Sequence, residues 1–151
     1  MLTSEILNRA ADLIEERGWT VGDWGLGDDH SMPLCLEGGI AVASGNNLIG
    51  SVLLEKCPAA RAVHEYLLLA DDEQLWEWND RSMSYCARVG VPFGGSDDRT
   101  AADVIEVLRA AAVVEQAREA ERAQLVTRDE WETFDAPVQC AAVPVAAVSA
   151  K

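Results

Sequence analysis

The residues best suited to chemistry lie in a glycine-rich segment near the N-terminus. Asp28, Asp29 and His30 bring two carboxylates and an imidazole together, and Cys35 follows five residues later. Such groups can ligate a metal ion or support nucleophilic hydrolysis. A metal site needs three or four converging ligands, and the other histidine, His64, is distant in sequence. We therefore assign no metal ligand, no catalytic residue and no cofactor, and keep a small metal-dependent hydrolase as an alternative function.

Cys35 lacks the local features of an activated nucleophile. Its neighbours are Leu34 and Leu36, which indicate a buried, unreactive thiol. The four cysteines are widely spaced, which is typical neither of a zinc knuckle nor of a dense disulfide framework. The N-terminal residues lack the basic and apolar regions of a signal peptide. We expect reduced thiols and a cytoplasmic protein.

The most distinctive local motif is Trp78-Asn79-Asp80. A functional interpretation places Asn79 and Asp80 as a polar pair in a pocket roofed by Trp76 or Trp78. A structural interpretation makes Trp78 a core residue and lets Asn79 or Asp80 end a helix and form a turn. The structural interpretation is favoured because such residues commonly form turns after helices.

A second candidate site is the acidic segment containing Trp131 and Phe134. Two aromatic residues among acids resemble a short interaction segment that docks on its own domain, on a second copy or on a basic partner surface. A disordered tail is the equal alternative, because two aromatic residues are few anchors.

Charge and composition exclude several classes of protein. The chain has 151 residues, 26 acidic and 12 basic side chains, a net charge of −14 and 49% apolar residues. That length suits one domain, and the apolar fraction is too high for a wholly disordered acidic chain. A general nucleic-acid binder needs a basic face, and an anionic membrane surface repels acids. The apolar stretch 138–150 is too short to span a bilayer.

Hydrophobic periodicity predicts a mainly α fold, a compact domain of about five helices with long glycine-rich loops. Thr3 is expected as the N-cap of the first helix, with Leu2 and Leu7 as a hydrophobic staple and Gly18 at its end, where Trp19 packs back on Ile14. The helices are expected at residues 4–17, 34–45, 58–69, about 75–78 and 100–125, and a further segment of unspecified type at residues 48–56.

Several details of this prediction can be compared with a structure. A buried strand is the competing prediction for residues 34–45, where Gly38 and Gly39 would allow close helix approach. Asp71 or Asp72 is expected to cap the helix near residue 75, and Thr100 with Asp103 approximates a capping box. Residues 1–125 are predicted to form one helical domain and residues 126–151 an irregular or extended tail.

Four segments together resemble a known family. They are Ala10–Ile14 with Gly18-Trp19, Cys35–Ile40, Trp78–Asp80 and Arg99–Ile105. In order and spacing they are similar to a family of small uncharacterised proteins from actinobacteria and their bacteriophages. The resemblance covers about residues 6–112 and implies a compact, mainly helical fold. It implies no catalytic residues, and the segment between Asp80 and Arg99 is longer than in typical members.

We therefore expect a non-enzymatic protein-interaction or regulatory factor, such as a bacteriophage accessory protein that acts on a host protein. The expected partner is a protein, without direct nucleic-acid or membrane contact, and a homodimer is a further option. One alternative is an acidic nucleic-acid mimic that occupies a DNA-binding protein, which requires carboxylates spaced like phosphates along one face. The other is the metal-dependent hydrolase.

Overall fold

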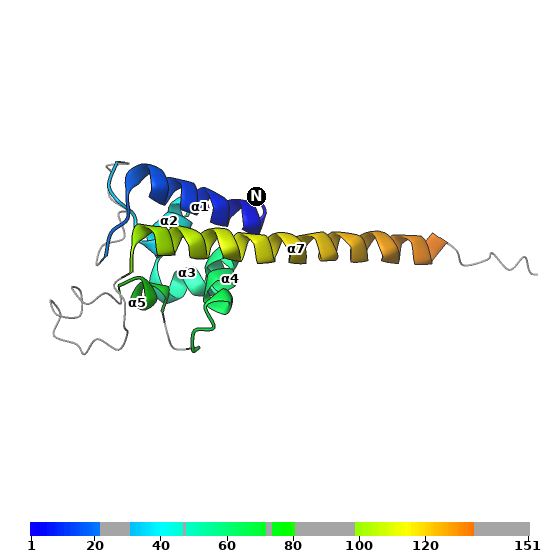
Figure 1. Ribbon diagram of the computed structural model, residues 1–151. Coiled ribbons are helices and arrows are strands. Elements are labelled where there is room, and N and C mark those ends of the chain that lie inside the picture. Colours follow the sequence, from blue (N-terminus) through cyan, green and yellow to red (C-terminus); the bar gives the residue numbers. More distant parts are fainter. Residues whose placement is uncertain (22–30, 47, 72–73, 81–98, 135–151) are drawn as a thin grey trace, which may run out of the picture. The chain divides into compact units, whose positions relative to one another are not determined.

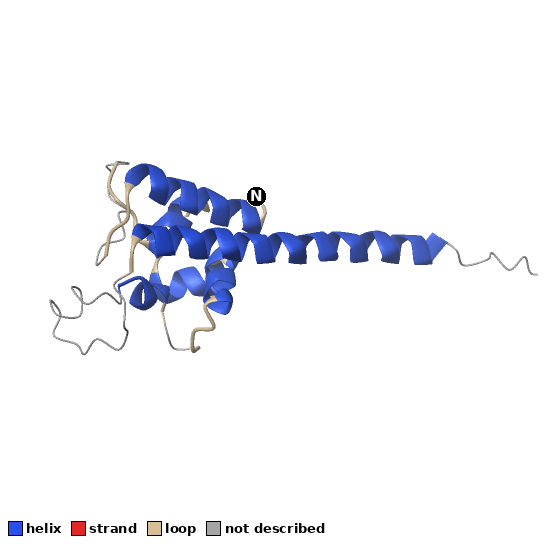
Figure 2. Ribbon diagram, viewed as in Figure 1, coloured by secondary structure: helices blue, strands red, loops and turns tan. Residues whose placement is uncertain are grey.

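A computed structural model describes residues 1–21, 31–46, 48–71, 74–80 and 99–134, with side chains described as far as residue 125. Helices dominate these residues and no strand is among them, which confirms the predicted mainly helical fold (Figures 1 and 2). The chain divides into two compact units, Met1–Glu119 and Ala120–Lys151. Within the described residues, no helix combines the length and apolar character needed to cross a membrane.

Six helices follow one another along the described chain. They are α1 (Thr3–Arg17), α2 (Leu36–Ala43), α3 (Gly50–Lys56), α4 (Pro58–Tyr66), α5 (Leu75–Asp80) and α7 (Ala101–Phe134). The helix at α2 therefore prevails over the strand considered for this segment. Pro58 occupies the first turn of α4, where its missing N–H costs nothing.

The ends of α1 differ from the prediction. Leu2, not Thr3, is the N-cap residue, because the Glu5 carboxylate accepts a hydrogen bond from the Leu2 N–H at 2.8 Å. Leu2 is 54% exposed, so it does not form the expected staple. Gly18 ends the helix with a φ of +91°, but its ψ of 161° is extended. The chain consequently leaves α1 as an extended segment, and Trp19 forms a parallel bridge with Leu34.

The core of the first unit forms where α1 and α2 pack closely. Gly39 lies so near α1 that a Cβ atom in its place would be 2.9 Å from Ile14 Cδ1. Ile14 and Ile40 are both buried there, and α4, α5 and α7 contribute Val63, Trp78 and Leu108 to the same cluster. The small residue at position 39 thus permits the close helix approach that the sequence predicts.

α7 begins as expected and ends later than expected. Thr100 donates its N–H to Asp103 Oδ2 at 2.7 Å, and the Asp103 N–H donates to Thr100 Oγ1 at 3.3 Å, which completes the capping box. The prediction of an irregular tail from residue 126 is wrong for residues 126–134, which continue the helix. Helix-forming residues run on past Leu125, and the first proline after them is Pro137. Residues 135–151 lie outside the described chain.

The short helix α5 is capped differently from the prediction. Gln74 immediately precedes it, and its backbone N–H donates to Glu77 Oε2 at 2.9 Å. The carboxylate of Glu77 thereby satisfies an N-terminal N–H that the predicted Asp71 or Asp72 cap would have served. Asp72 lies outside the described residues.

Candidate functional site

The side chain of Asn79 connects three segments inside the first unit. Asn79 is fully buried in α5, and its Oδ1 accepts hydrogen bonds from Trp19 Nε1 at 2.8 Å and from the Leu36 N–H at 3.0 Å. Its Nδ2 donates to the Thr20 carbonyl oxygen at 3.2 Å and to Asp80 Oδ1 at 2.7 Å. Both lone-pair positions and both amide hydrogens are therefore used. We call this set the Asn79 network.

The two neighbours of Asn79 are also buried. Trp78 is 8% exposed and belongs to the core. The guanidinium of Arg99 stacks over the Trp78 ring with 3.7 Å between the guanidinium carbon and the ring centroid, and Arg99 Nε donates to the Trp78 carbonyl oxygen. Such cation–π stacking ties the residues just before α7 to α5. Asp80 is 5% exposed.

A buried carboxylate next to this network escaped the sequence interpretation. Glu37 in α2 is fully buried, and its Oε2 accepts the Gly50 N–H at 2.9 Å while Oε1 accepts the Trp76 N–H at 3.1 Å. One carboxylate thereby serves the N-termini of both α3 and α5, where backbone N–H groups favour negative charge. The signal in the sequence is a single glutamate between Leu36 and Gly38 in an otherwise apolar helix.

Cys35 has a structural role at the start of α2. Its Sγ accepts the Gly38 N–H at 3.3 Å and so caps the helix. Burial, with smaller contributions from the nearby Glu37 and Asp80 carboxylates, raises the pKa of the Cys35 thiol to about 12. The thiol is therefore protonated near neutral pH, which disfavours its use as a nucleophile.

The remaining predicted chemical residues are not brought together in the described chain. Asp28, Asp29 and His30 lie outside the described residues. Among those that the structure describes, no group of three or more His, Cys, Asp or Glu side chains could hold a metal ion. Trp131 and Phe134 lie in the last turns of α7, beyond the residues whose side chains are described.

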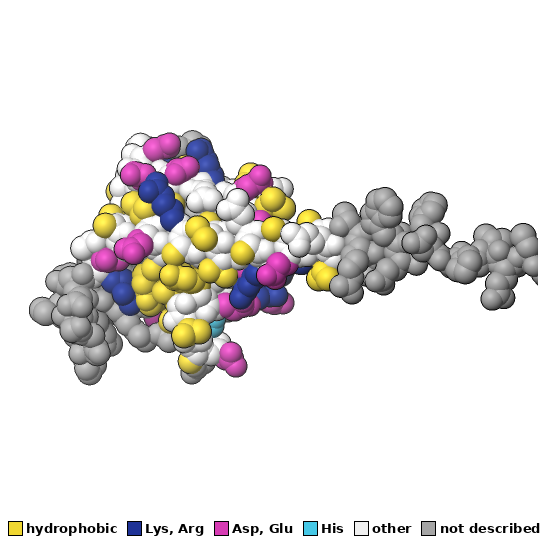
Figure 3. Space-filling model, turned by 45° about the vertical axis from the view of Figure 1, so that its right-hand side comes forward, with side chains coloured by type: hydrophobic (Ala, Val, Ile, Leu, Met, Phe, Trp, Pro, Cys, Tyr) yellow, Lys and Arg dark blue, Asp and Glu magenta, His cyan; other side chains and the backbone are white. Residues whose placement is uncertain are grey.

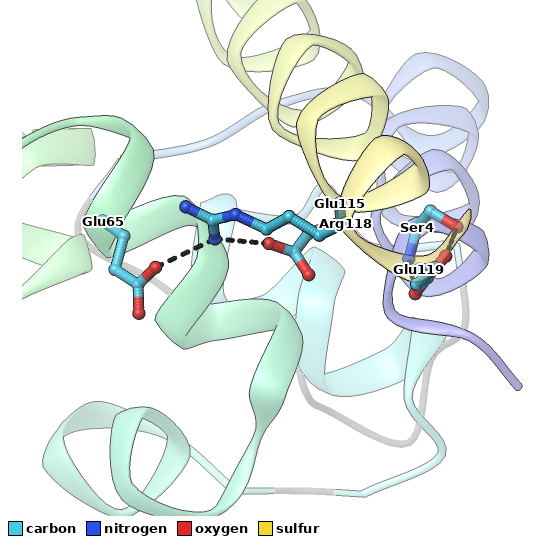
Figure 4. Close-up of polar contacts among 5 residues, drawn as sticks. All are labelled: Ser4, Glu65, Glu115, Arg118 and Glu119. Atoms are coloured by element: carbon cyan, nitrogen blue, oxygen red, sulfur yellow. Dashed lines mark hydrogen bonds and ion pairs between the residues drawn. The ribbon is translucent and has the colours of Figure 1, made fainter. Parts of the chain in front are cut away.

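Ionic and polar contacts fix α7 to α1 and α4 within the first unit (Figure 4). Glu119 accepts hydrogen bonds from Ser4 Oγ at 2.6 Å and from the Ser4 N–H at 3.2 Å. Arg118 Nη1 lies 3.0 Å from Glu65 Oε2 and 2.6 Å from Glu115 Oε1. Because Glu119 meets the first turn of α1, it also opposes the positive end of that helix.

The end of α4 exposes large apolar side chains. Leu68 is 90% exposed and has a φ of +54°, and Tyr66 is 42% exposed. The half-buried Leu67 and Leu69 on either side of Leu68 pack against the core. This arrangement directs one apolar side chain into solvent at a turn whose backbone is held by its neighbours.

Comparisons with known proteins locate the chain in a family but not in a function. Neither the curated proteins nor the solved structures contain a significant match. A family model described as a family of unknown function, DUF6197, matches residues 1–114. This range takes in the Asn79 network, Glu37, the end of α4 and the first part of α7. On the strength of that match, the chain belongs to the DUF6197 family.

Proposed function

We propose that this protein acts by binding another protein, as an acidic interaction or regulatory factor. The observation that carries the proposal is the conformation and exposure of Leu68. In keeping with the resemblance to actinobacterial and bacteriophage proteins, the proposed partner is a protein of an actinobacterial host cell. The cytoplasm is the proposed compartment.

Leu68 occupies a backbone conformation that glycine adopts more cheaply. Its φ of +54° is left-handed, which costs a residue with a Cβ atom about 1–2 kcal/mol. Its N–H donates to the Glu65 carbonyl oxygen at 3.1 Å, and the Leu69 N–H donates to the His64 carbonyl oxygen at 3.3 Å. A leucine here gains almost no burial in the monomer, since it is 90% exposed. Burial of that side chain in a partner would offset the strain.

The polar residues of the first unit support a binding role rather than chemistry. Asn79 and Glu37 are fully buried and bonded to backbone groups, and the Cys35 thiol is protonated because burial raises its pKa. Buried side chains whose polar atoms already hydrogen-bond other segments of the chain are poorly placed to contact a substrate. The apolar side chains of Tyr66 and Leu68 at the end of α4 are instead exposed to solvent.

The face drawn in Figure 3 does not favour the nucleic-acid mimic. On this face the acidic side chains lie in separate places among basic and hydrophobic ones, and they form no continuous row. A mimic of a phosphate backbone needs regularly spaced negative charge. Hydrophobic side chains gather densely on part of the same face, as suits contact with a protein.

The test compares the wild type with Leu68→Gly as affinity-tagged baits in an actinobacterial lysate. Glycine removes the exposed side chain and relieves the positive φ, so we expect unchanged or higher stability together with loss of the captured protein. Val52→Ala, at another exposed apolar residue (41%), is the matched control and should retain the captured protein. Equal recovery by the wild type and Leu68→Gly, or no recovery by the wild type, would contradict the proposal.

A further inference from the structure

A shallow groove lies along α1 and α7 in the first unit. Apolar side chains of α7 line it, and Glu15 of α1 and Glu106 of α7 lie among them. Val113, one of these apolar residues, is 66% exposed. The apolar lining residues are Ala102, Ile105, Ala110 and Val113. They span three turns of α7, roughly 17 Å, which matches a partner helix of similar length.

The charges beside the groove are predominantly negative. Arg109, which also lines it, lies 2.7 Å from Glu15 Oε2 and 3.6 Å from Asp12 Oδ1. Two carboxylates therefore offset its single positive charge. Glu106 adds a further carboxylate on the same helix, so the groove borders carry three acids against one base. An apolar strip bordered in this way complements a segment with apolar residues flanked by lysine or arginine.

A basic segment is opposite in charge to the acidic borders of the groove, whereas a second copy of this chain is not. Each copy carries a net charge of −14, and two acidic borders brought together would repel. An anionic lipid surface would be repelled for the same reason. A basic segment would instead be attracted over long range and then held by the apolar strip.

We propose that the groove between α1 and α7 binds a cationic amphipathic helix of a partner protein. Its apolar residues pack on Ile105, Ala110 and Val113, and its basic residues face Glu15 and Glu106. The proposal concerns a surface separate from Leu68, which follows α4. It stands or falls independently of the role proposed for Leu68, because its test uses a defined peptide rather than a captured protein.

The probe is a fluorescein-labelled 14-residue peptide of leucine, alanine and lysine, with leucines at i, i+3, i+4 and i+7. Fluorescence anisotropy with the full chain should show binding that weakens as salt concentration rises. We expect Val113→Ser to weaken binding at least fivefold. Val114→Ser, at a neighbouring exposed valine outside the groove lining, should change it less than twofold. Circular dichroism checks that both variants retain their helices.

Charge variants and peptide variants complete the test. Glu106→Gln should weaken binding about twofold and reduce its salt dependence, while Glu121→Gln on the same helix should do neither. A peptide with serine in place of leucine should bind at least fivefold more weakly. The proposal is overturned by absence of binding at low salt. It is also overturned if Val113→Ser and Val114→Ser weaken peptide binding to the same extent. The same holds if the serine peptide binds as tightly as the leucine peptide, because binding would then reflect only general attraction of a basic peptide to an acidic protein.

Discussion

Trp19 Nε1 donates a hydrogen bond of 2.8 Å to Asn79 Oδ1, although the two residues are 60 positions apart in the chain. The same oxygen accepts the Leu36 N–H, so one amide joins the end of α1, the start of α2 and α5. Three of the segments that characterise the sequence thus meet at one side chain. This position makes Asn79 the first residue to test.

Asn79→Ala should be strongly destabilising. It leaves the half-buried Trp19 indole N–H and the buried Leu36 N–H without their acceptor, and the Thr20 carbonyl oxygen without its donor. Unsatisfied buried groups of this kind cost about 1–3 kcal/mol each, so we expect a loss of roughly 3 kcal/mol in the free energy of unfolding. Urea denaturation measures it. Asn8→Ala, at an exposed residue bonded to the Ser4 carbonyl oxygen, should lose less than about 1 kcal/mol. Similar losses in both variants would refute the central role of Asn79.

Glu37→Gln tests the shared cap of α3 and α5. A glutamine has one acceptor oxygen, and its amide N–H₂ must face one of the two backbone N–H groups now bonded to the carboxylate. We expect a loss of about 2 kcal/mol in stability from that lost bond and the lost charge. Glu16→Gln, on an exposed face of α1, is the matched control and should be close to neutral. A neutral Glu37→Gln would mean that the two N-termini do not depend on the carboxylate.

Gly39→Ala should destabilise the protein in a way that depends on Ile14. Alanine improves helix propensity by up to about 1 kcal/mol, but overpacking a buried contact costs about 1–3 kcal/mol. The new Cβ would lie 2.9 Å from Ile14 Cδ1, so the overpacking should prevail. In an Ile14→Val background Cδ1 is absent and the closest remaining contact is with Cγ1 at 3.2 Å, so Gly39→Ala should be clearly less destabilising than in the wild type. A double-mutant cycle by thermal denaturation checks this, and additive effects would show that the two residues do not interact.

Cys35 should make stability fall at alkaline pH. Burial raises the thiol pKa from 9.0 in the unfolded chain to about 12 in the folded one, so the folded state favours the protonated thiol. This contribution is fully present below pH 9 and is lost as pH rises from about 9 towards 12. Cys35→Ser keeps a side-chain acceptor for the Gly38 N–H and does not titrate there. The variant should therefore show a shallower decline than the wild type in urea melts between pH 8 and 11, and identical slopes would count against the shift.

Local patterns predict the helices well because local physics determines them. The apolar stripe of α1, Pro58 at the start of α4 and the Thr100–Asp103 box can each be recognised within a few residues of sequence. The ends of helices are harder to predict where a nearby side chain other than the expected cap accepts a hydrogen bond from the first backbone N–H groups. Glu5 takes the Leu2 N–H and starts α1 early, and Gln74 with Glu77 replaces the predicted aspartate cap of α5.

The hydrogen bonds of the buried polar side chains could not be predicted, because the bonded groups are distant in sequence. Local sequence indicates a turn former at Asn79, yet the hydrogen bonds of its side chain reach residues 43 and 60 positions away in the chain. Helical periodicity depends on apolar residues and does not single out Glu37, and nothing local indicates that its carboxylate is buried against two helix ends. The exposure of Leu68 likewise depends on a backbone turn that Leu67 and Leu69 impose by packing inwards.

The stack of Arg99 on Trp78 has a consequence for the chain between positions 80 and 99. Asp80 is buried at the end of α5, and Arg99 is held against the residue two positions before it, so the chain positions 80 and 99 are secured whatever connects them. Closing a connection of twice the length costs only about 0.6 kcal/mol more. The contacts that hold Trp78, Asp80 and Arg99 in place are therefore independent of the length of the chain between positions 80 and 99.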